Sequence, residues 1–111
     1  MGIKDTHFMS EHKIGTVDNL KSGEMKLVKA GDKKLLLANI KGKYYCMNGI
    51  CTHALAYLWD GVLDEETGCL TCPLHASQFD VRTGKVLGPP AIEDEPVYHV
   101  KVKGKDLFIE I

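Results

Sequence analysis

The chain has 111 residues, 26% of them charged, and a formal net charge of −1 at pH 7. This length suits one domain around one core, and 14 basic residues against 15 acidic ones argue against nucleic-acid binding through a basic face. No apolar run is long enough to cross a bilayer, and the residues after Met1 lack the apolar stretch of a secretory signal. We therefore expect a soluble, cytoplasmic protein without a membrane segment.

Along the chain, residues 1–12 show no pattern and are expected to form a loose tail. Five short runs then have the period of strands: 25–28, 34–40, 44–47, 99–102 and 107–111. Turn signals at hairpin length separate them, namely 31–32, 41–43 and 104–106. The segment 54–59 is the one plausible helical turn, and it is too short to be more than a bridge in a loop. The pattern predicts an all-β sandwich or small barrel.

Two short motifs carry the chemistry of the chain. Cys51 and His53 lie two residues apart, and Cys72 and His75 follow after a gap of eighteen residues. Two thiolates and two imidazoles suit either a tetrahedral zinc ion or a [2Fe–2S] centre in which two Cys hold one iron and two His hold the other. Zinc fingers normally pair Cys with Cys and His with His, whereas each pair here is mixed. The spacing therefore favours the iron–sulfur centre.

These motifs resemble the Rieske signature, Cys-x-His followed by Cys-x-x-His, and the likeness continues through 74–90. The resemblance implies a β-sandwich or barrel base formed by 13–47 and 89–111, with a cluster-binding insertion at 48–88. It implies that Cys51, His53, Cys72 and His75 hold one [2Fe–2S] cluster. Ser77 is then expected to donate a hydrogen bond to a cluster sulfide, and Pro89 and Pro90 are expected to cover the cluster, with Leu74 helping to screen it from water.

The resemblance implies a soluble ferredoxin, similar to the ferredoxin components of ring-hydroxylating dioxygenase systems. Such a protein carries one electron at a time from a reductase to an oxygenase or another terminal oxidoreductase and is not itself an enzyme. We expect a monomer whose partners dock transiently at an exposed tip formed by His53 and His75. Two alternatives stay open: the small subunit of a nitrite-reductase-like complex, and a zinc-stabilised interaction domain.

Several positions depart from the high-potential Rieske proteins. Those proteins join the two ligand loops by a disulfide at positions that correspond to Ala56 and Leu74 here. Phe79 replaces a tyrosine that donates to a ligand sulfur, which predicts a reduction potential in the lower part of the Rieske range. Ala76 stands where the family usually has Gly, so its backbone should avoid positive φ or be strained.

The remaining cysteines and the charges carry weaker predictions. Cys46 and Cys69 are expected to be buried, reduced thiols rather than a disulfide. Between positions 48 and 99, eight acidic residues stand against two basic ones, whereas the rest of the chain holds twelve Lys and seven acidic residues. Two interpretations are equally open: a solvated face, or an acidic collar around the cluster that steers a basic patch on a partner.

Overall fold

The computed structural model describes residues 10–53 and 55–111. Its strands are β1 Glu11–Thr16, β2 Met25–Ala30, β3 Lys33–Ile40, β4 Lys43–Asn48, β5 Val62–Asp64, β6 Cys69–Thr71, β7 Gln78–Asp80, β8 Val86–Gly88, β9 Val97–Tyr98, β10 Lys101–Lys103 and β11 Asp106–Glu110. Two 3₁₀ turns, η2 Val17–Asn19 and η3 Leu58–Asp60, are the helical segments of the described part. None of its helices is long and apolar enough to cross a membrane.

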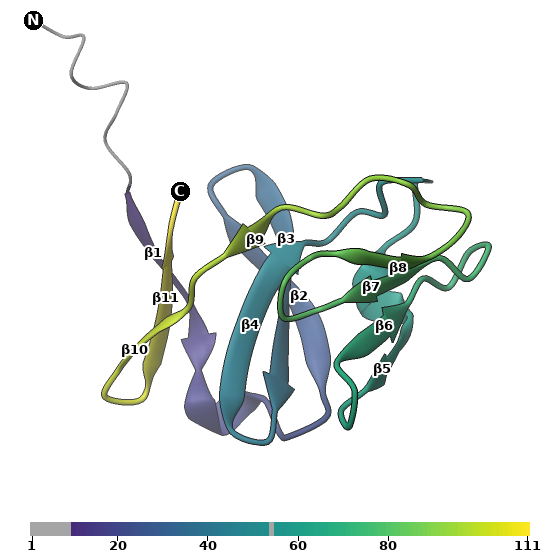
Figure 1. Ribbon diagram of the computed structural model, residues 1–111. Coiled ribbons are helices and arrows are strands. Elements are labelled where there is room, and N and C mark those ends of the chain that lie inside the picture. The colour runs from purple at the N-terminus through teal and green to yellow at the C-terminus, as the bar shows by residue number, and fades with distance from the viewer. Residues whose placement is uncertain (1–9, 54) are drawn as a thin grey trace, which may run out of the picture.

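The strands form three antiparallel sheets. The central sheet has the order β2-β3-β4-β9, a second sheet has the order β1-β11-β10, and a third has the order β5-β6-β7-β8. Figure 1 shows the second sheet on the left of the central sheet and the third on the right. The β5–β8 sheet comes from one continuous segment, inserted between β4 and β9 of the central sheet.

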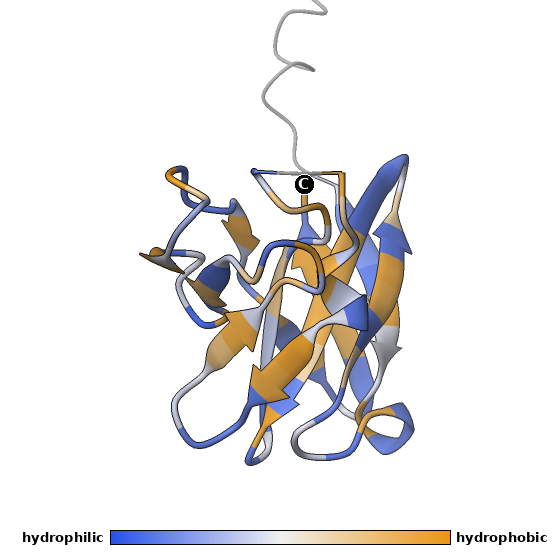
Figure 2. Cartoon of the chain, turned by 90° about the vertical axis from the view of Figure 1, so that its right-hand side faces the viewer, coloured by the Kyte–Doolittle hydropathy of each residue, from blue (hydrophilic) through white to orange (hydrophobic). Residues whose placement is uncertain are grey.

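Strand β3 explains why the central sheet has a core on each face. Its residues are buried from Leu35 to Ile40, and side chains alternate between the two faces of a strand. Leu35 and Leu37 pack toward the sheet of β1, β11 and β10, whereas Leu36 and Ala38 pack toward the sheet of β5–β8. In Figure 2 the strands are largely apolar and the turns at their lower ends are largely polar.

The strands predicted at 25–28, 34–40, 44–47 and 107–111 correspond to β2, β3, β4 and β11, and each of the three predicted turns joins neighbouring strands. The single strand predicted at 99–102 is wrong, because His99 and Val100 separate β9 from β10. The helical turn predicted at 54–59 is a 3₁₀ turn shifted to Leu58–Asp60, and Ala54 lies outside the described residues. The expected loose tail is wrong for Glu11 and His12, because both pair with β11. The rest of that tail, up to position 9, lies outside the described residues.

Candidate metal centre

The first Cys–His motif lies in the loop between β4 and η3. The N–H of Cys51 donates to the carbonyl of Ala56 (3.0 Å), and the N–H of Leu58 donates to the carbonyl of Gly49 (2.8 Å), so the loop closes on itself. Trp59 lies so close to Gly49 that a Cβ at this position would overlap the indole ring. The first loop, 49–57, therefore rests directly on an aromatic side chain.

The second motif lies in the turn between β6 and β7. The N–H of Cys72 donates to the carbonyl of Ser77 (2.7 Å), which closes the second loop, 72–77. His75 and Ala76 both have positive φ, 66° and 58°. Residues other than Gly adopt this left-handed conformation only at a cost in free energy. The loop therefore carries backbone strain at Ala76, which was one of the two outcomes expected from the sequence.

The four side chains separate by type. Cys51 and Cys72 are buried, with 4% and 2% of their surfaces exposed, and both belong to the core between the central sheet and β5–β8. His53 and His75 are exposed, and their rings meet edge to face with centroids 5.6 Å apart. The two loops therefore bring thiol to thiol inside and imidazole to imidazole at the surface.

The pKa of the Cys72 thiol also reflects its proximity to the Cys51 thiol. Burial raises the pKa of the Cys72 thiol above its ordinary value, and a hydrogen bond with the Cys51 thiol adds to the rise. A backbone hydrogen bond from Leu74 acts in the opposite direction. A nearby cation that compensates the negative charge favours the thiolate form of Cys72, and metal ligation supplies such a cation.

The donor arrangement fits two metal ions better than one. Within the described residues, no group of three or more His, Cys, Asp or Glu side chains converges on a point where a single metal ion could be held. A tetrahedral zinc site needs such convergence of its protein ligands. A [2Fe–2S] centre of the His₂Cys₂ type needs instead one pair of thiolates and one pair of imidazoles, which is the grouping observed.

A third segment, the strap 89–96, connects the two loops. Its Ala91 N–H donates to the hydroxyl oxygen of Ser77 (3.0 Å), and Ser77 is fully buried. The hydrogen bonds of the described residues use this oxygen as an acceptor and leave the hydroxyl proton available. Pro89 and Pro90, joined by a cis peptide bond, begin the strap and are exposed. Leu74, expected to screen the cluster from water, is 45% exposed, and its screening role stays a prediction.

Glu95 in this strap was missed as a site residue, because the sequence counts it only as one more acid. It is 2% exposed, and its oxygens accept N–H groups from Thr52 (2.8 Å) and Asn48 (2.9 Å). Burial raises its pKa, whereas the hydrogen bonds from Asn48 and Thr52 lower it. In the sequence, Glu95 is only a Glu in a segment flanked by prolines. That pattern does not distinguish a buried acidic residue from an exposed one.

The acidic collar is smaller than the sequence suggests. Glu66 pairs with Lys41 (3.0 Å), and Glu65 accepts the hydroxyl of Ser22 (2.7 Å), both in the β5–β6 hairpin that lies at the opposite end of β6 from Cys72. Other acidic residues are also engaged: Asp80 with Arg82, and Asp94 with the N–H of Val86. Glu65 and Glu66 therefore do not belong to an acidic ring around the histidines, and for the other expected members the ring stays a prediction.

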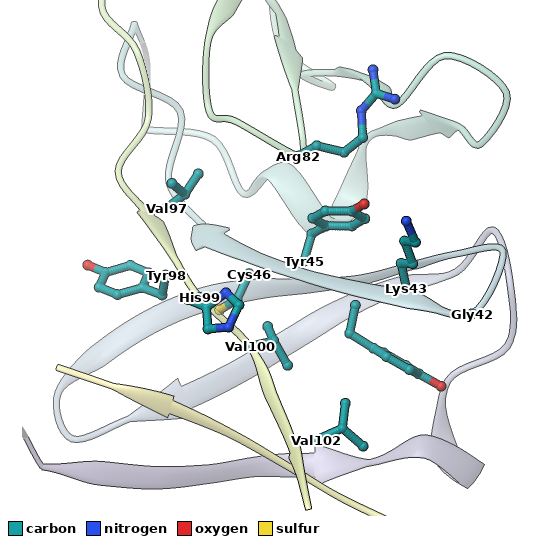
Figure 3. Close-up of a pocket in the computed structure, with 11 residues that line it drawn as sticks. Gly42, Lys43, Tyr45, Cys46, Arg82, Val97, Tyr98, His99, Val100 and Val102 are labelled. Atoms are coloured by element: carbon teal, nitrogen blue, oxygen red, sulfur yellow. The ribbon is translucent and has the colours of Figure 1, made fainter.

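A groove of about 500 Å³ lies on the base, away from both loops. It opens beside β4 where β9 ends after two residues and the chain leaves toward β10 (Figure 3). Its lining combines Tyr45, Tyr98 and Val100 with the basic groups of Lys43 and Arg82, and no acidic side chain lines it. The Arg82 guanidinium is already held by Asp80 and by the carbonyl of Thr67.

Comparison with known proteins agrees with this geometry. Residues 10–104 match the family model described as Rieske [2Fe-2S] domain. The chain is 33% identical over 95 residues, 86% of this chain and 89% of the relative, to the ferredoxin component of the naphthalene 1,2-dioxygenase/salicylate 5-hydroxylase systems of a Ralstonia species. It is similar over nearly the whole length of that relative.

Solved structures show the same likeness. The ferredoxin of carbazole 1,9a-dioxygenase from Nocardioides aromaticivorans IC177 superposes with a TM-score of 0.87 at 30% identity, covering 90% of this chain and 96% of that one. A chain in a complex of reduced oxygenase and oxidized ferredoxin in carbazole 1,9a-dioxygenase gives 0.83 at 26% identity, covering 89% and 91%. The mixed Cys–His motifs, the inserted sheet and these likenesses agree, and the chain belongs to the Rieske [2Fe–2S] domain family.

Proposed function

We propose that the protein is the ferredoxin component of an oxygenase system, a one-electron carrier and not a catalyst. The observation that carries this proposal is the separation of its four donors, with two thiols in the core and two imidazoles at the surface. Its relatives are named as ferredoxin components and support the same role.

In this proposal Cys51 and Cys72 hold the inner iron and His53 and His75 hold the outer iron. The bound cluster supplies reversible uptake of one electron. Neutral imidazoles in place of two thiolates make the centre less negative, so that it accepts an electron more readily than an all-Cys cluster does. Segment 48–88 serves as the cluster-binding insertion, and the remaining described residues serve as its base.

Three further residues surround the cluster in this proposal. Ser77 directs its available hydroxyl proton at a cluster sulfide, since its oxygen is already engaged by Ala91. Pro89 and Pro90 cover one side of the cluster from the start of the strap. The exposed imidazoles form the shortest route for an electron between the outer iron and a partner at the surface.

The surface around the histidines supports docking through apolar contacts. Leu55 follows His53 by two residues and is 95% exposed, and Leu74 immediately precedes His75. Ile92, 88% exposed, lies in the strap next to the residue that binds Ser77. Exposed apolar side chains gathered at one place mark interaction sites, and a small one suits a transient electron-transfer contact.

We infer two partners for this tip. The acceptor is a terminal oxygenase, as in the oxygenase–ferredoxin complex to which the chain is similar. The donor is a reductase that uses the same tip at a different time, because one exposed pair of imidazoles serves both transfers. A zinc-stabilised interaction domain is disfavoured by the lack of a single point of convergence for the donors within the described residues.

The absorption and EPR spectra of the purified protein test the proposal. We expect a red-brown oxidised protein that is EPR-silent, and a rhombic signal of a single unpaired electron after reduction with dithionite. Cys72→Ser should lose colour and signal, because an alkoxide poorly replaces a thiolate that balances the charge of its iron. A colourless protein that contains zinc, or a coloured Cys72→Ser variant with the wild-type signal, would overturn the assignment.

A further inference from the structure

Glu95 is a buried carboxyl group. Only 2% of its surface is exposed, and among the residues that the structure describes no Lys, Arg or His forms an ion pair with it. Isolated charges in a protein interior are costly and persist only where hydrogen bonds compensate them. A buried carboxyl group such as that of Glu95 therefore needs a structural or functional explanation.

Its two oxygens are used by the first loop. Oε2 accepts the N–H of Thr52 (2.8 Å), which lies between Cys51 and His53, and Oε1 accepts the side-chain amide of Asn48 (2.9 Å). The same Asn48 amide donates to the carbonyl of Ile50 (3.0 Å), one residue before Cys51. Because both oxygens accept and neither donates, these are the hydrogen bonds of the charged carboxylate.

Neighbouring backbone groups hold Glu95 in place. The hydroxyl of Thr52 donates to the carbonyl of Glu93 (2.8 Å), and the N–H of Asn48 donates to the carbonyl of Pro96 (2.9 Å). The N–H of Glu95 itself donates to the carbonyl of Gly84 (2.7 Å). The strap is thus joined to the first loop on both sides of Glu95, and the carboxylate cannot turn away without breaking this contact.

We propose that Glu95 is a positioning residue of the metal centre, which fixes the backbone between Cys51 and His53 and whose buried charge lowers the reduction potential. The proposal rests on the proposed function, because it assigns the cluster to this loop. Reduction adds one negative charge to the centre, and a buried carboxylate beside it makes this addition less favourable.

Three variants separate positioning from charge. Glu95→Gln removes the charge and leaves one of the two N–H donors without an acceptor oxygen. Glu95→Asp keeps the charge but is one methylene too short to reach Thr52. Glu93→Gln is the matched control, because this exposed carboxyl lies two residues away in the same strap and the described residues use only its carbonyl. Voltammetry gives the potentials, and hydrogen exchange by mass spectrometry gives the protection of the peptide 48–53.

We expect Glu95→Gln to raise the potential above that of Glu93→Gln, and both Glu95 variants to exchange about tenfold faster over 48–53, while Glu95→Asp keeps a potential near the wild-type value. Loss of the cluster from both Glu95 variants, in protein that keeps the native circular dichroism, also supports positioning. Potential and exchange equal to those of Glu93→Gln would overturn the proposal, and so would loss of the fold together with the cluster, because Glu95 would then be a structural residue. A wild-type protein without a cluster would instead refute the proposed function.

Discussion

Ala76 adopts a left-handed backbone conformation that Gly would adopt without strain. Its φ is 58° and that of the preceding His75 is 66°, so two successive L-residues occupy a region that costs each of them roughly 1–2 kcal/mol. The side chain of Ala76 is exposed and contributes no core packing that would offset this cost. The second loop is therefore held open against the preference of its own sequence.

Ala76→Gly should stabilise the folded protein by about 0.5–1 kcal/mol. Release of the left-handed strain outweighs the extra entropy of Gly in the unfolded chain, which is about 0.4–1 kcal/mol. Chemical denaturation of the cluster-loaded protein measures the change. Ala91→Gly is the control: Ala91 is buried and its φ is not positive, so the same replacement should destabilise by about 1 kcal/mol or more. Equal losses in both variants would contradict a strained loop.

Cys46 is a thiol that the fold makes inert. It is 1% exposed on β4, and burial raises its pKa to about 12. At pH 8 only about one such thiol in ten thousand is a thiolate, the form that reacts. Cys69 was also expected to be buried. It is instead half-buried at the start of β6.

Iodoacetamide at pH 8 should therefore label the folded, cluster-loaded protein at Cys69 and not at Cys46. The expected product carries one added group by intact mass, since Cys51 and Cys72 are engaged by the cluster. Cys69→Ser should take up none. Peptide mapping that places a label on Cys46 in the folded protein would show that β4 opens or that the thiol is exposed.

Among the elements, the strands that the sequence predicts combine length with a clear apolar pattern. The runs at β2, β3, β4 and β11 have six, eight, six and five residues in the structure and carry a clear apolar pattern. β5 to β8 have three residues each, too few for a period to show, and their pairing depends on the insertion as a whole.

The functional residues also fall into a group that the sequence predicts and a group that it does not. The four Cys and His residues could be found from their spacing, because ligand type and order are properties of the sequence. Among the strands, β1 was missed because it contains His12, Lys13 and Gly15 and few apolar residues. It forms by antiparallel pairing with β11. Glu95 could not be found, since burial of a charged residue depends on which segments meet above it. Contacts between distant segments decide both cases.

The strap depends on one glycine in the turn between β7 and β8. Gly84 has a φ of +78° and its carbonyl accepts the N–H of Glu95 (2.7 Å), and a Cβ at this position would overlap the carbonyl oxygen of Glu95. Gly104 has a similar φ of +64°, but a Cβ added there would meet nothing within 4 Å. The two glycines therefore share a backbone requirement and differ in crowding.

Gly84→Ala should destabilise the protein by about 2 kcal/mol more than Gly104→Ala, because overlap with the strap adds to the shared cost of positive φ. Displacement of the strap by the added methyl group should also loosen the cluster. The visible colour should therefore fade faster on heating in Gly84→Ala than in Gly104→Ala. Thermal denaturation followed at the visible band measures both effects. Equal midpoints for the two variants would mean that the strap moves aside freely and does not support the first loop.

At the scale of the whole molecule, the exposed imidazoles of His53 and His75 belong to the segment 48–88 and not to the base. The net charge of the chain is −1, and two carboxylates of the inserted sheet are neutralised in the Glu66–Lys41 and Asp80–Arg82 ion pairs. Exposed ion pairs contribute little to stability, but they leave little free charge for steering. On the proposed function, we therefore expect a partner to meet chiefly the apolar side chains beside the histidines.

Electron self-exchange between oxidised and reduced copies tests this tip without any other protein. Ile92→Asp places a carboxylate on both meeting surfaces, and like charges at such a contact should slow the exchange about tenfold. Val102→Asp is the matched control, because Val102 is also exposed, 53%, but lies on β10 away from the two loops. NMR line widths in mixtures of the two redox states give the rates. Equal slowing by both substitutions would place the exchange surface elsewhere.

On the proposed function, two imidazoles and two thiolates hold one cluster, one pair to each iron. Pulsed EPR of the dithionite-reduced protein measures it most directly, because a nitrogen bound to iron couples strongly to the unpaired electron. We expect two strongly coupled ¹⁴N nuclei, assigned to His53 and His75, with one lost in His75→Cys if a cluster survives. A reduced spectrum without strongly coupled nitrogen would contradict it, because the cluster would then be held by sulfur alone and the exposed histidines would have no part in electron transfer.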